Sequence, residues 1–458
     1  MKKSRLLIMA IMAMFCSLSF AQTTWYVSTN GDDENNTGSE SSPWASIKKA
    51  INTAQADDII QVKAGTYTEV NITVSKNLTI MGESPATTIV QATGSKPDGA
   101  GTGKAPNQRV FMISGSVSAT LKDMSIRYGN LSGGVGGGIN TQGNAVLSIE
   151  NCNIYDNFTD RAAGGIGGYG NTTIKNSSVF DNTAEGNGGG LAFFGVSLSM
   201  ENCVVYRNHS NLKGGAISIT NTGGVLSLKN NTIVSNTTNS DGRKGIFTEN
   251  STCSALTNNI LFNASSAGTD FGYDGSVNPV AAATVKNNIV SKCWLAEIRN
   301  EANSITWETA TAVTESNLKL GSLQDNGSGL QTLALQVGSI AIDAGDATTA
   351  TSTDIHGSSR TGTPDIGSYE YTPATNIEQV SVKTSVVPNP SSGTFNIEVN
   401  ELSNGNVDIY TLNGKLVHSE SITSGRTSIT LPANINGLVF IKVSGEGYSE
   451  VFKHIVRK

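Results

Sequence analysis

Histidine is scarce in this chain of 458 residues. Of the four histidines, His418 and His454 lie near the C-terminal end, which leaves His209 and His356 for the rest of the chain. The sequence has no G-x-S-x-G motif and no His/Cys grouping with the spacing of zinc ligands. Nucleophilic catalysis by a Ser-His-Asp set and a structural zinc site are therefore poorly supported.

Charged and aromatic residues are also few. Charged residues make up 15% of the chain and aromatic residues 6%, and the formal net charge of -6 gives no electrostatic reason to expect a nucleic acid as partner. Glycine, by contrast, reaches 50 residues, and Asn, Ser and Thr are abundant. This balance is typical of a protein built from many short strands and turns rather than from helices.

A single long apolar run stands at the start of the chain. A basic stretch at residues 2–5 precedes the apolar residues 6–15, and small residues follow at 19–21. This pattern predicts a signal peptide over residues 1–21, cleaved between Ala21 and Gln22. Because no second such run follows, we expect export from the cytoplasm and no transmembrane span in the mature protein.

An internal repeat dominates the central part of the sequence. Five strong copies read KDMSIRYG, ENCNIYDN, KNSSVFDN, ENCVVYRN and KNNTIVSN, and two weaker ones read TNNILFN and KNNIVSK. The second residues of the copies recur every 25 to 29 residues: Asp123, Asn151, Asn176, Asn202, Asn230, Asn258 and Asn287. Such a period indicates a solenoid.

Each copy alternates in a way that fixes which side chains face inward. In all seven copies, the position two before this second residue is apolar: Leu121, Ile149, Ile174, Met200, Leu228, Leu256 and Val285. Three residues after it, the strong copies have Ile126, Ile154, Val179, Val205 and Ile233. Because side chains alternate between the faces of a strand, both positions are predicted to point inward.

The residue immediately before the second residue of each strong copy alternates in charge: Lys122, Glu150, Lys175, Glu201 and Lys229. Stacked strands lie about 4.8 Å apart, so opposite charges would meet at every step of an outward column. The charge alternation supports the predicted register.

Two kinds of corner recur in each copy. Glycine pairs, which permit close backbone approach, stand at Gly137-Gly138, Gly164-Gly165, Gly189-Gly190 and Gly214-Gly215. Asparagines, which tolerate left-handed geometry and stack by amide hydrogen bonds, stand at Asn157, Asn182, Asn208 and Asn236. A parallel β-helix satisfies all of these constraints.

The motifs GGGI at 136–139, GGGL at 188–191 and GGAI at 214–217 resemble the repeats of chlamydial-type polymorphic outer-membrane proteins. More broadly, the repeats resemble the pectate-lyase-like superfamily, and this resemblance implies a right-handed β-helix. It implies little about activity, because one fold carries many functions.

Four cysteines remain after the signal peptide. Cys152 and Cys203 occupy the same repeat position two coils apart, or about 9.6 Å, which is too far for a disulfide. We expect them to be small core residues. The sequence leaves open whether Cys253 and Cys293 pair.

Both ends of the solenoid carry capping signals. Trp25-Tyr26-Val27 predicts a strand and Ser46 predicts the start of a helix, in a segment that resembles the N-terminal caps of secreted bacterial β-helix proteins. The acidic loop at residues 32–34 is interpreted as solvated rather than as a calcium site. At the other end, residues 339–371 resemble the closing segment of surface β-helix proteins. Five charged residues there are predicted to form a structural network rather than a catalytic cluster: Asp343, Asp354, Arg360, Asp365 and Glu370.

The final part of the chain has a different pattern. Short strand-like runs follow one another, with Asn413-Gly414 as a hairpin signal, and they predict a small Ig-like antiparallel β-sandwich. PNP at 388–390, GTF at 393–395, VDIY at 407–410, NGK at 413–415 and GLVFIKV at 437–443 resemble the C-terminal sorting domain of the Bacteroidetes type IX secretion system. This resemblance implies export through the outer membrane, removal of the domain, and release or attachment to surface lipopolysaccharide.

We therefore predict four parts: a signal peptide at 1–21, an all-β parallel β-helix at 22–371, a linker at 372–384 and a sorting domain at 385–458. The expected location is the medium or the cell surface, and the expected partner is the type IX secretion machinery.

Two hypotheses about function remain open. In the first, the protein is a non-enzymatic surface β-helix that binds glycans or mediates adhesion. Tyr155, Phe180 and Tyr206 each follow an inward residue, so they are predicted to form an outward aromatic stack suited to sugar rings or to stabilising the coils.

In the second hypothesis, the protein is a polysaccharide lyase or glycosidase. A lyase needs a base and a cation to neutralise the uronate carboxylate. Lys213 and Arg161, which stand upstream of glycine pairs, are the candidate catalytic residues. Asp156 and Asp181 share a repeat position and are candidate calcium ligands, although Arg207 in the next coil makes a charge ladder the alternative.

Overall fold

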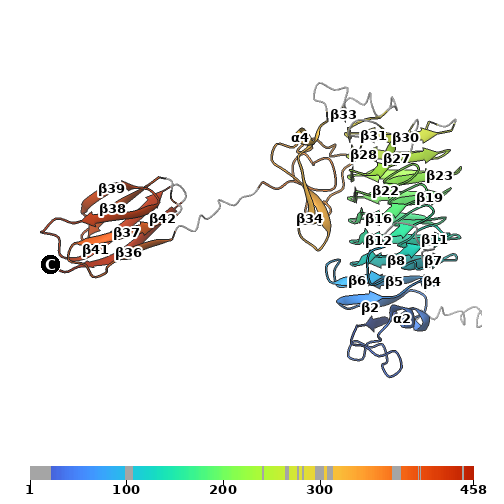
Figure 1. Cartoon of the computed structure of the whole chain (residues 1–458), viewed down its shortest axis with the longest axis horizontal. Helices are drawn as coiled ribbons and strands as arrows, with labels where there is room; N and C mark the ends of the chain where they lie inside the picture. Colours follow the sequence, from blue (N-terminus) through green and yellow to red (C-terminus); the bar gives the residue numbers. More distant parts are fainter. Residues whose placement is uncertain are drawn as a thin grey trace, which may run out of the picture. The chain divides into compact units, whose positions relative to one another are not determined.

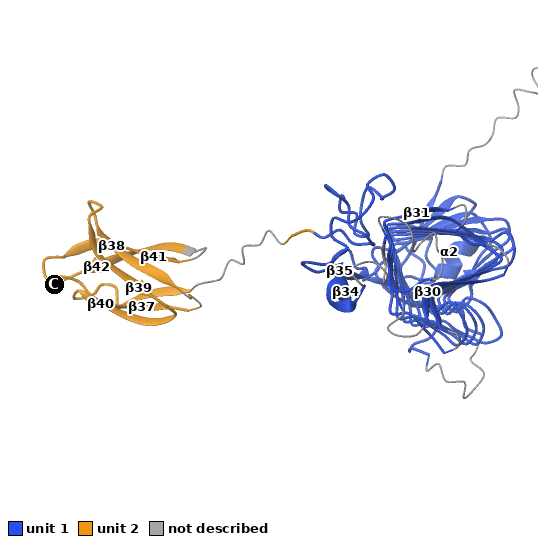
Figure 2. Ribbon diagram, turned by 90° about the horizontal axis from the view of Figure 1, so that it is seen from above, with its two compact units in different colours: residues 1–371 blue, residues 372–458 orange. Residues whose placement is uncertain are grey.

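The structure is a computed structural model that describes residues 22–97, 107–239, 242–263, 268–275, 278–280, 283–293, 304–306, 313–373, 383–400, 402, 404–445 and 448–458. The expected signal peptide, including Ala21, and residues 374–382 of the expected linker lie outside these ranges. Contacts divide the chain into two compact units, residues 1–371 and 372–458 (Figure 2). Within the described ranges, no helix has the length and apolar character needed to cross a membrane.

The first unit is a solenoid whose coils pass through four parallel sheets in a fixed order (Figure 1). Sheet 1 contains β1 (Thr24–Val27), β2 (Asp58–Val62), β5 (Leu78–Met81), β8 (Ser118–Lys122), β12 (Val146–Glu150), β16 (Asn171–Lys175), β20 (Ser197–Glu201), β24 (Val225–Lys229), β28 (Thr252–Thr257) and β31 (Thr284–Lys286). Sheet 2 contains β3 (Gly65–Thr68), β6 (Thr88–Gln91), β9 (Ser125–Arg127), β13 (Asn153–Tyr155), β17 (Ser178–Phe180), β21 (Val204–Tyr206), β25 (Thr232–Val234), β29 (Ile260–Phe262), β32 (Ile289–Val290) and β33 (Ile305–Thr306).

The other two sheets complete each coil. Sheet 3 is made of two-residue strands: β10 (Asn130–Leu131), β14 (Phe158–Thr159), β18 (Thr183–Ala184), β22 (His209–Ser210) and β26 (Thr237–Thr238). Sheet 4 contains β4 (Ile72–Val74), β7 (Phe111–Ser114), β11 (Ile139–Gln142), β15 (Ile166–Gly168), β19 (Leu191–Phe194), β23 (Ile217–Thr220), β27 (Arg243–Glu249) and β30 (Thr269–Asp274). Every strand pair in these four sheets is parallel, as a solenoid requires.

The predicted register is confirmed by the strand pairing. Leu121, Ile149 and Ile174 are fully buried and align across β8, β12 and β16. The outward charge ladder follows the same register: Lys122 lies 3.6 Å from Glu150, and Lys175 lies 3.2 Å from Glu201. These pairs are half-exposed, so each stabilises the fold only weakly, by about 1 kcal/mol or less.

Left-handed backbone geometry recurs at two places in the repeat, one of which was not identified as a corner from the sequence. All seven residues that mark the repeat, from Asp123 to Asn287, have φ between 45° and 55°, the left-handed geometry that Asn and Asp tolerate. At the second corner, Asn157, Asn182, Asn208 and Asn236 do not take the left-handed geometry that the sequence suggested. It falls instead on the residue before each: Asp156, Asp181, Arg207 and Ser235.

The second-corner asparagines point inward and form a hydrogen-bonded ladder. The Nδ2 of Asn182 donates to Oδ1 of Asn208 at 3.0 Å, and Asn208 donates in the same way to Asn236. The next step is Asn263, and the ladder ends on the buried carboxylate of Asp270. Burial raises the pKa of Asp270 to about 6. The ladder satisfies polar groups that the narrow interior would otherwise leave unpaired.

The glycine pairs lie where neighbouring coils approach most closely. A Cβ added to Gly165 would stand 2.7 Å from the carbonyl oxygen of Gly190, so a side chain has no room there. Gly214 also has φ of 66°, which favours glycine on its own.

Cys152 and Cys203 are fully buried in one inward column, with Ser177 between them, as predicted. The four cysteines of the described chain are buried thiols. Cys253 lies in sheet 1, whereas Cys293 forms a β-bridge with Phe271 of sheet 4. The sequence left open whether these two cysteines pair, and in the structure no disulfide joins them.

The N-terminal cap contains β1 and α2 (Ile47–Thr53), and Ser46 caps the helix as predicted. Asp33 accepts hydrogen bonds from the backbone of Ala45 and Ser46. This acid of the loop at 32–34 therefore holds the entry to the helix.

The closing segment extends beyond the residues 339–371 that the sequence indicated, and from here on the name covers residues 313–371. It begins with α4 (Glu315–Leu318) and the antiparallel hairpin of β34 (Leu320–Asp325) and β35 (Gln331–Leu335). It packs on the outer surface of sheet 2 through a second apolar cluster that includes Val204, Ile260, Leu333 and Ile366. Figures 1 and 2 show the hairpin beside the coils. Sheet 2 is therefore buried on both faces in the coils that this segment covers.

The second unit is the predicted antiparallel sandwich. One sheet contains β36 (Thr384–Val387), β37 (Thr394–Val399) and β40 (Gly425–Thr430). The other contains β39 (Leu416–Ile422), β38 (Gly405–Thr411), β41 (Gly437–Gly445) and β42 (Tyr448–Val456). Their inner faces share one apolar core, which includes Phe395, Ile409 and Ile441.

Candidate functional site

The two candidate lyase residues each lie just before a strand of sheet 4, but they are not close to each other. Lys213 precedes β23 and Arg161 precedes β15, with β19 between them, so they stand two coils or about 9.6 Å apart along the solenoid. The Lys213 ammonium is 2.6 Å from Asp274, which also receives Arg243 at 2.6 Å. Lys213 also lies 4.8 Å from the ring centre of Phe247, whereas Arg161 is exposed.

The two candidate calcium ligands are each paired with a different cation. Asp156 lies 2.5 Å from Lys96, and this hydrogen bond raises the pKa of Lys96. Asp181 receives two hydrogen bonds from the Arg207 guanidinium, at 2.9 and 2.7 Å, which raise the pKa of Arg207. This bidentate pair is the next step of the charge ladder that the sequence offered as the alternative.

The aromatic residues Tyr155, Phe180 and Tyr206 stand in one outward column of sheet 2, in register across β13, β17 and β21. The Tyr155 and Phe180 rings stack with centres 4.8 Å apart and an angle of 4°. The guanidinium of Arg127 approaches Tyr155 from the preceding coil, and its Nη1 donates to the tyrosine hydroxyl at 3.1 Å. Burial raises the pKa of Tyr155.

The closing segment covers part of this column. Phe180 retains 6% of its exposure, and Tyr155 and Tyr206 are half-buried. Between the β34–β35 hairpin and the coils remains an open groove of about 370 Å³, lined by Tyr155, Phe180, Asn153 and Gln331 among others. Because the ring faces are stacked, Tyr155 offers the groove its edge and hydroxyl.

A second outward aromatic pair was missed from the sequence. Tyr169 and Phe194 lie at the end of neighbouring strands in sheet 4, with ring centres 5.2 Å apart and an angle of 30°. Tyr169 is 52% exposed. Each residue stands four positions after the second glycine of its pair, Gly165 or Gly190, and this fixed offset was the available signal.

Ser328 and His356 form a hydrogen bond in the closing segment, with Oγ and Nδ1 2.9 Å apart. The buried hydroxyl of Thr332 contacts His356 Nε2 at 3.1 Å and accepts a hydrogen bond from Asn326. If the Thr332 hydroxyl donates to Nε2, Nδ1 carries the proton and donates to Ser328. In that tautomer His356 is not a base toward the serine, which agrees with the lack of a Ser-His-Asp signal.

Four of the five charged residues of the closing segment take part in a network through their side chains, whereas Asp343 is exposed and contributes only its backbone N–H. Arg360 and Glu370 are 3% and 7% exposed and lie 2.9 Å apart. Asp354 accepts from the backbone of Glu370, and Asp365 accepts from the backbone of Asp343. Burial raises the pKa of Asp365 to about 6. The partners belong to the closing segment except Asn202 of the solenoid, whose Oδ1 accepts from Arg360 Nη2 at 3.3 Å, so the geometry is that of a structural network that also ties the segment to the coils.

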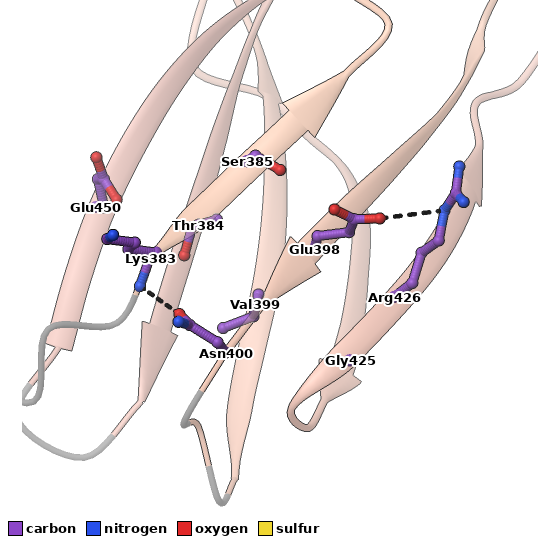
Figure 3. A pocket seen from close by; sticks show the side chains of 9 residues that line it. All are labelled: Lys383, Thr384, Ser385, Glu398, Val399, Asn400, Gly425, Arg426 and Glu450. Carbon is purple, nitrogen blue, oxygen red and sulfur yellow. Dashed lines mark hydrogen bonds and ion pairs between the residues drawn. The ribbon is translucent and has the colours of Figure 1, made fainter.

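The sandwich carries an open groove of its own (Figure 3). Lys383, Glu398, Arg426 and Glu450 contribute charges of both signs, and Glu398 lies 3.7 Å from Arg426. The backbone of Lys383 donates to Asn400. The exposed charges around this groove are screened by solvent, so it is not a strongly charged site.

Two family models match the chain. Residues 109–290 match the right-handed β-helix region, and residues 385–457 match the secretion system C-terminal sorting domain. A search of curated proteins finds no match.

Solved structures with a similar fold include pectate lyase Pel9A, at 16% identity and a TM-score of 0.42, covering 77% of this chain and 97% of that one. A rhamnogalacturonan lyase shares 14% identity with a TM-score of 0.34, covering 69% and 96%. Pectin methylesterase PemA from Erwinia chrysanthemi shares 15% with a TM-score of 0.24, covering 65% and 94%. At these values no activity is transferred to this chain.

The parallel solenoid and the C-terminal sandwich agree with the two family models. The sorting domain indicates handling by the type IX secretion system, and hence a secreted or surface-attached location. The chain is therefore an exported protein that joins a parallel β-helix, matched by the right-handed β-helix model over residues 109–290, to a type IX secretion C-terminal sorting domain.

Proposed function

We propose that the β-helix is a non-enzymatic glycan-binding protein that acts in adhesion at the cell surface or after release. The observation that carries this proposal is the Tyr169–Phe194 pair on the outer surface of sheet 4, where Tyr169 is 52% exposed. Neighbouring coils repeat at about 4.8 Å, so adjacent rings of one column can contact successive sugars of a chain laid along the solenoid. Exposed aromatic groups combine an apolar face with a polar tip, which suits sugar rings.

The charged candidates for lyase chemistry support the same proposal. A catalytic base needs a free approach to the substrate proton, and Lys213 is held by Asp274 beside a second cation, Arg243. Arg161 lies two coils away, and Asp156 and Asp181 are each neutralised by their own cation. Lys213, Asp156 and Asp181 thus have charged partners that a structural role explains, whereas Arg161 is exposed to solvent.

The groove beside Tyr155 and Phe180 is a second location for the same function, as the sequence predicted. Tyr206 lies farther along that column and lines another opening next to the hairpin, of about 260 Å³. A sugar there would meet ring edges and the amides of Asn153 and Gln331 rather than a ring face.

A glycan array with the mature protein tests the proposal and separates the two locations. Loss of one stacking contact worth about 1.4 kcal/mol lowers affinity about tenfold. We expect that loss in Tyr169→Ala and Phe194→Ala, whereas Tyr155→Ala and Tyr206→Ala report on the groove. Tyr273→Ala is the control, because this exposed tyrosine lies four coils from Tyr169. Binding that none of the four variants weakens would refute the aromatic sites.

A separate assay addresses catalysis. The mature protein is incubated with uronate-containing glycans, with and without calcium, and the ultraviolet absorbance of unsaturated products is followed. Product formation that disappears in Lys213→Ala or Arg161→Ala would overturn the non-enzymatic proposal.

A further inference from the structure

The two outer faces of the C-terminal sandwich differ in character. On the three-stranded sheet, the outward row across β36, β37 and β40 is polar: Ser385, Glu398 and Arg426 lie side by side in register. A single large apolar side chain, Val387, is strongly exposed there, at 46%. This is the ordinary composition of a solvated sheet face.

The outer face of the four-stranded sheet is apolar toward one end. We call this surface the apolar face; it comprises Tyr410, Leu412, Leu416, Leu438, Phe440, Val451 and Ile455. Tyr410 pairs with both Leu416 and Phe440, and Leu438 pairs with Ile455, so the side chains are direct neighbours. Leu412 is 72% exposed, Val451 57% and Leu416 48%.

The core of the sandwich does not use these side chains. The alternate residues of the same strands, Val407, Ile409, Val439 and Ile441, are buried inside. The apolar face is therefore extra exposed apolar surface on a small domain, which marks an interaction site more often than chance exposure.

Three lysines lie beside the apolar residues, and we call them the lysine rim; Lys453 stands between Val451 and Ile455 on β42. Lys453 pairs with Phe440, Lys442 pairs with Val451, and Lys415 lies in the turn before Leu416. Asp408 is the nearest carboxylate in register, opposite Lys442, and its Oδ1 accepts hydrogen bonds from Asn406 and Ser419. The rim thus keeps a positive balance, and a second copy of the same face would place lysines against lysines.

We propose that the apolar face docks onto a protein of the type IX secretion machinery whose own surface has an apolar centre and an acidic rim. The sorting domain indicates handling by the secretion system, which must therefore contact this domain, and the apolar face offers both area and charge for that contact. The apolar centre supplies affinity, and the lysine rim orients the partner and speeds association.

Export of the full chain tests this docking. Leu438→Ser combined with Ile455→Ser removes the apolar centre, and Lys442→Glu combined with Lys453→Glu reverses the rim. Val387→Ser and Arg426→Glu are matched controls on the polar face. We expect at least tenfold less protein outside the cell for both double variants, with accumulation in the periplasm and an unchanged unfolding transition of the purified chain. The controls should be exported normally.

Two results would overturn the proposal. One is normal export of both double variants. The other is impaired export that the controls share equally, because the effect would then not belong to the apolar face. Vesicles containing anionic lipid provide the second measurement: if the rim reversal abolishes vesicle binding while export stays normal, the face contacts a membrane instead of a secretion protein.

Discussion

The asparagine ladder inside the solenoid gives the sharpest stability prediction. The side chain of Asn208, which is fully buried, takes part in four hydrogen bonds. It accepts from the backbone N–H and the Nδ2 of Asn182, and it donates to Val179 and Asn236. In Asn208→Ala, the buried backbone N–H of Asn182 loses its acceptor, whereas the Nδ2 of Asn182 keeps its hydrogen bonds to Ile154 and Phe180. At about 2 kcal/mol for one buried donor left unpaired, the free energy of unfolding should fall by about 2 kcal/mol.

Two measurements check the value. Urea denaturation of the wild type and the variant gives the change in unfolding free energy, and hydrogen exchange reports directly on the Asn182 amide, which should exchange faster. The matched control is Asn239→Ala, which removes an exposed Asn–Asn hydrogen bond to Asn211 and should change stability by about 0.5 kcal/mol or less. If Asn208→Ala costs less than about 1 kcal/mol, or no more than the control, the ladder is not what stabilises the corner.

Three further predictions concern the closing segment and the sorting domain. Replacing Arg360 by alanine leaves Glu370 as a buried unpaired charge, so we expect a loss of about 3–5 kcal/mol and faster proteolysis of the closing segment, whereas Arg426→Ala at an exposed pair should be nearly neutral. The raised pKa of Asp365, about 6, lies above its unfolded value of about 3.9. Its contribution to stability is therefore full below about pH 4 and is lost as the pH rises through 6, so Asp365→Asn should weaken the gain in unfolding midpoint between pH 7 and pH 5. Deletion of residues 385–458 should trap the protein in the periplasm, and normal surface levels of the truncated form would contradict the sorting role.

The coils were predictable because their determinants are local and repeat. A position such as Ile154 recurs in each of the five strong copies, so an error in one copy is corrected by the others. The same holds for the charge ladder, whose alternation was visible before any pairing was known. The sequence predicted left-handed geometry at Asn157, because asparagine tolerates it, but the structure has it one residue earlier, at Asp156. The side chain of Asn157 instead points inward and donates to Asn182.

The candidate sites were harder to predict because they depend on contacts distant in the sequence. No residue near Lys213 in the sequence indicates its ion pair with Asp274, because Asp274 lies two coils later. The Phe247 ring, from the coil between them, lies under the Lys213 ammonium. Similarly, the exposure of Phe180 depends on a hairpin about 150 residues downstream, whose Gln331 carbonyl accepts the hydroxyl of Ser178. Periodicity predicts which residues form an outward column of a sheet, but it does not predict which distant segment of the chain packs over that column.

The docking position of the closing segment nevertheless left a trace in the sequence. In sheet 2 the outward residue before the inward one is polar at Asn153 and Ser178 but apolar at Val204 and Ile260, and Thr232 between the latter two is hydrogen-bonded to Ser368 of the closing segment. A strand with two adjacent apolar residues, such as Val204-Val205, has no polar face to give to water. The change from polar to apolar therefore marks where sheet 2 passes under the apolar cluster of the closing segment. Sheet 4 shows no comparable cover among the described residues near Tyr169, which is why its aromatic pair remains exposed and carries the proposed glycan site.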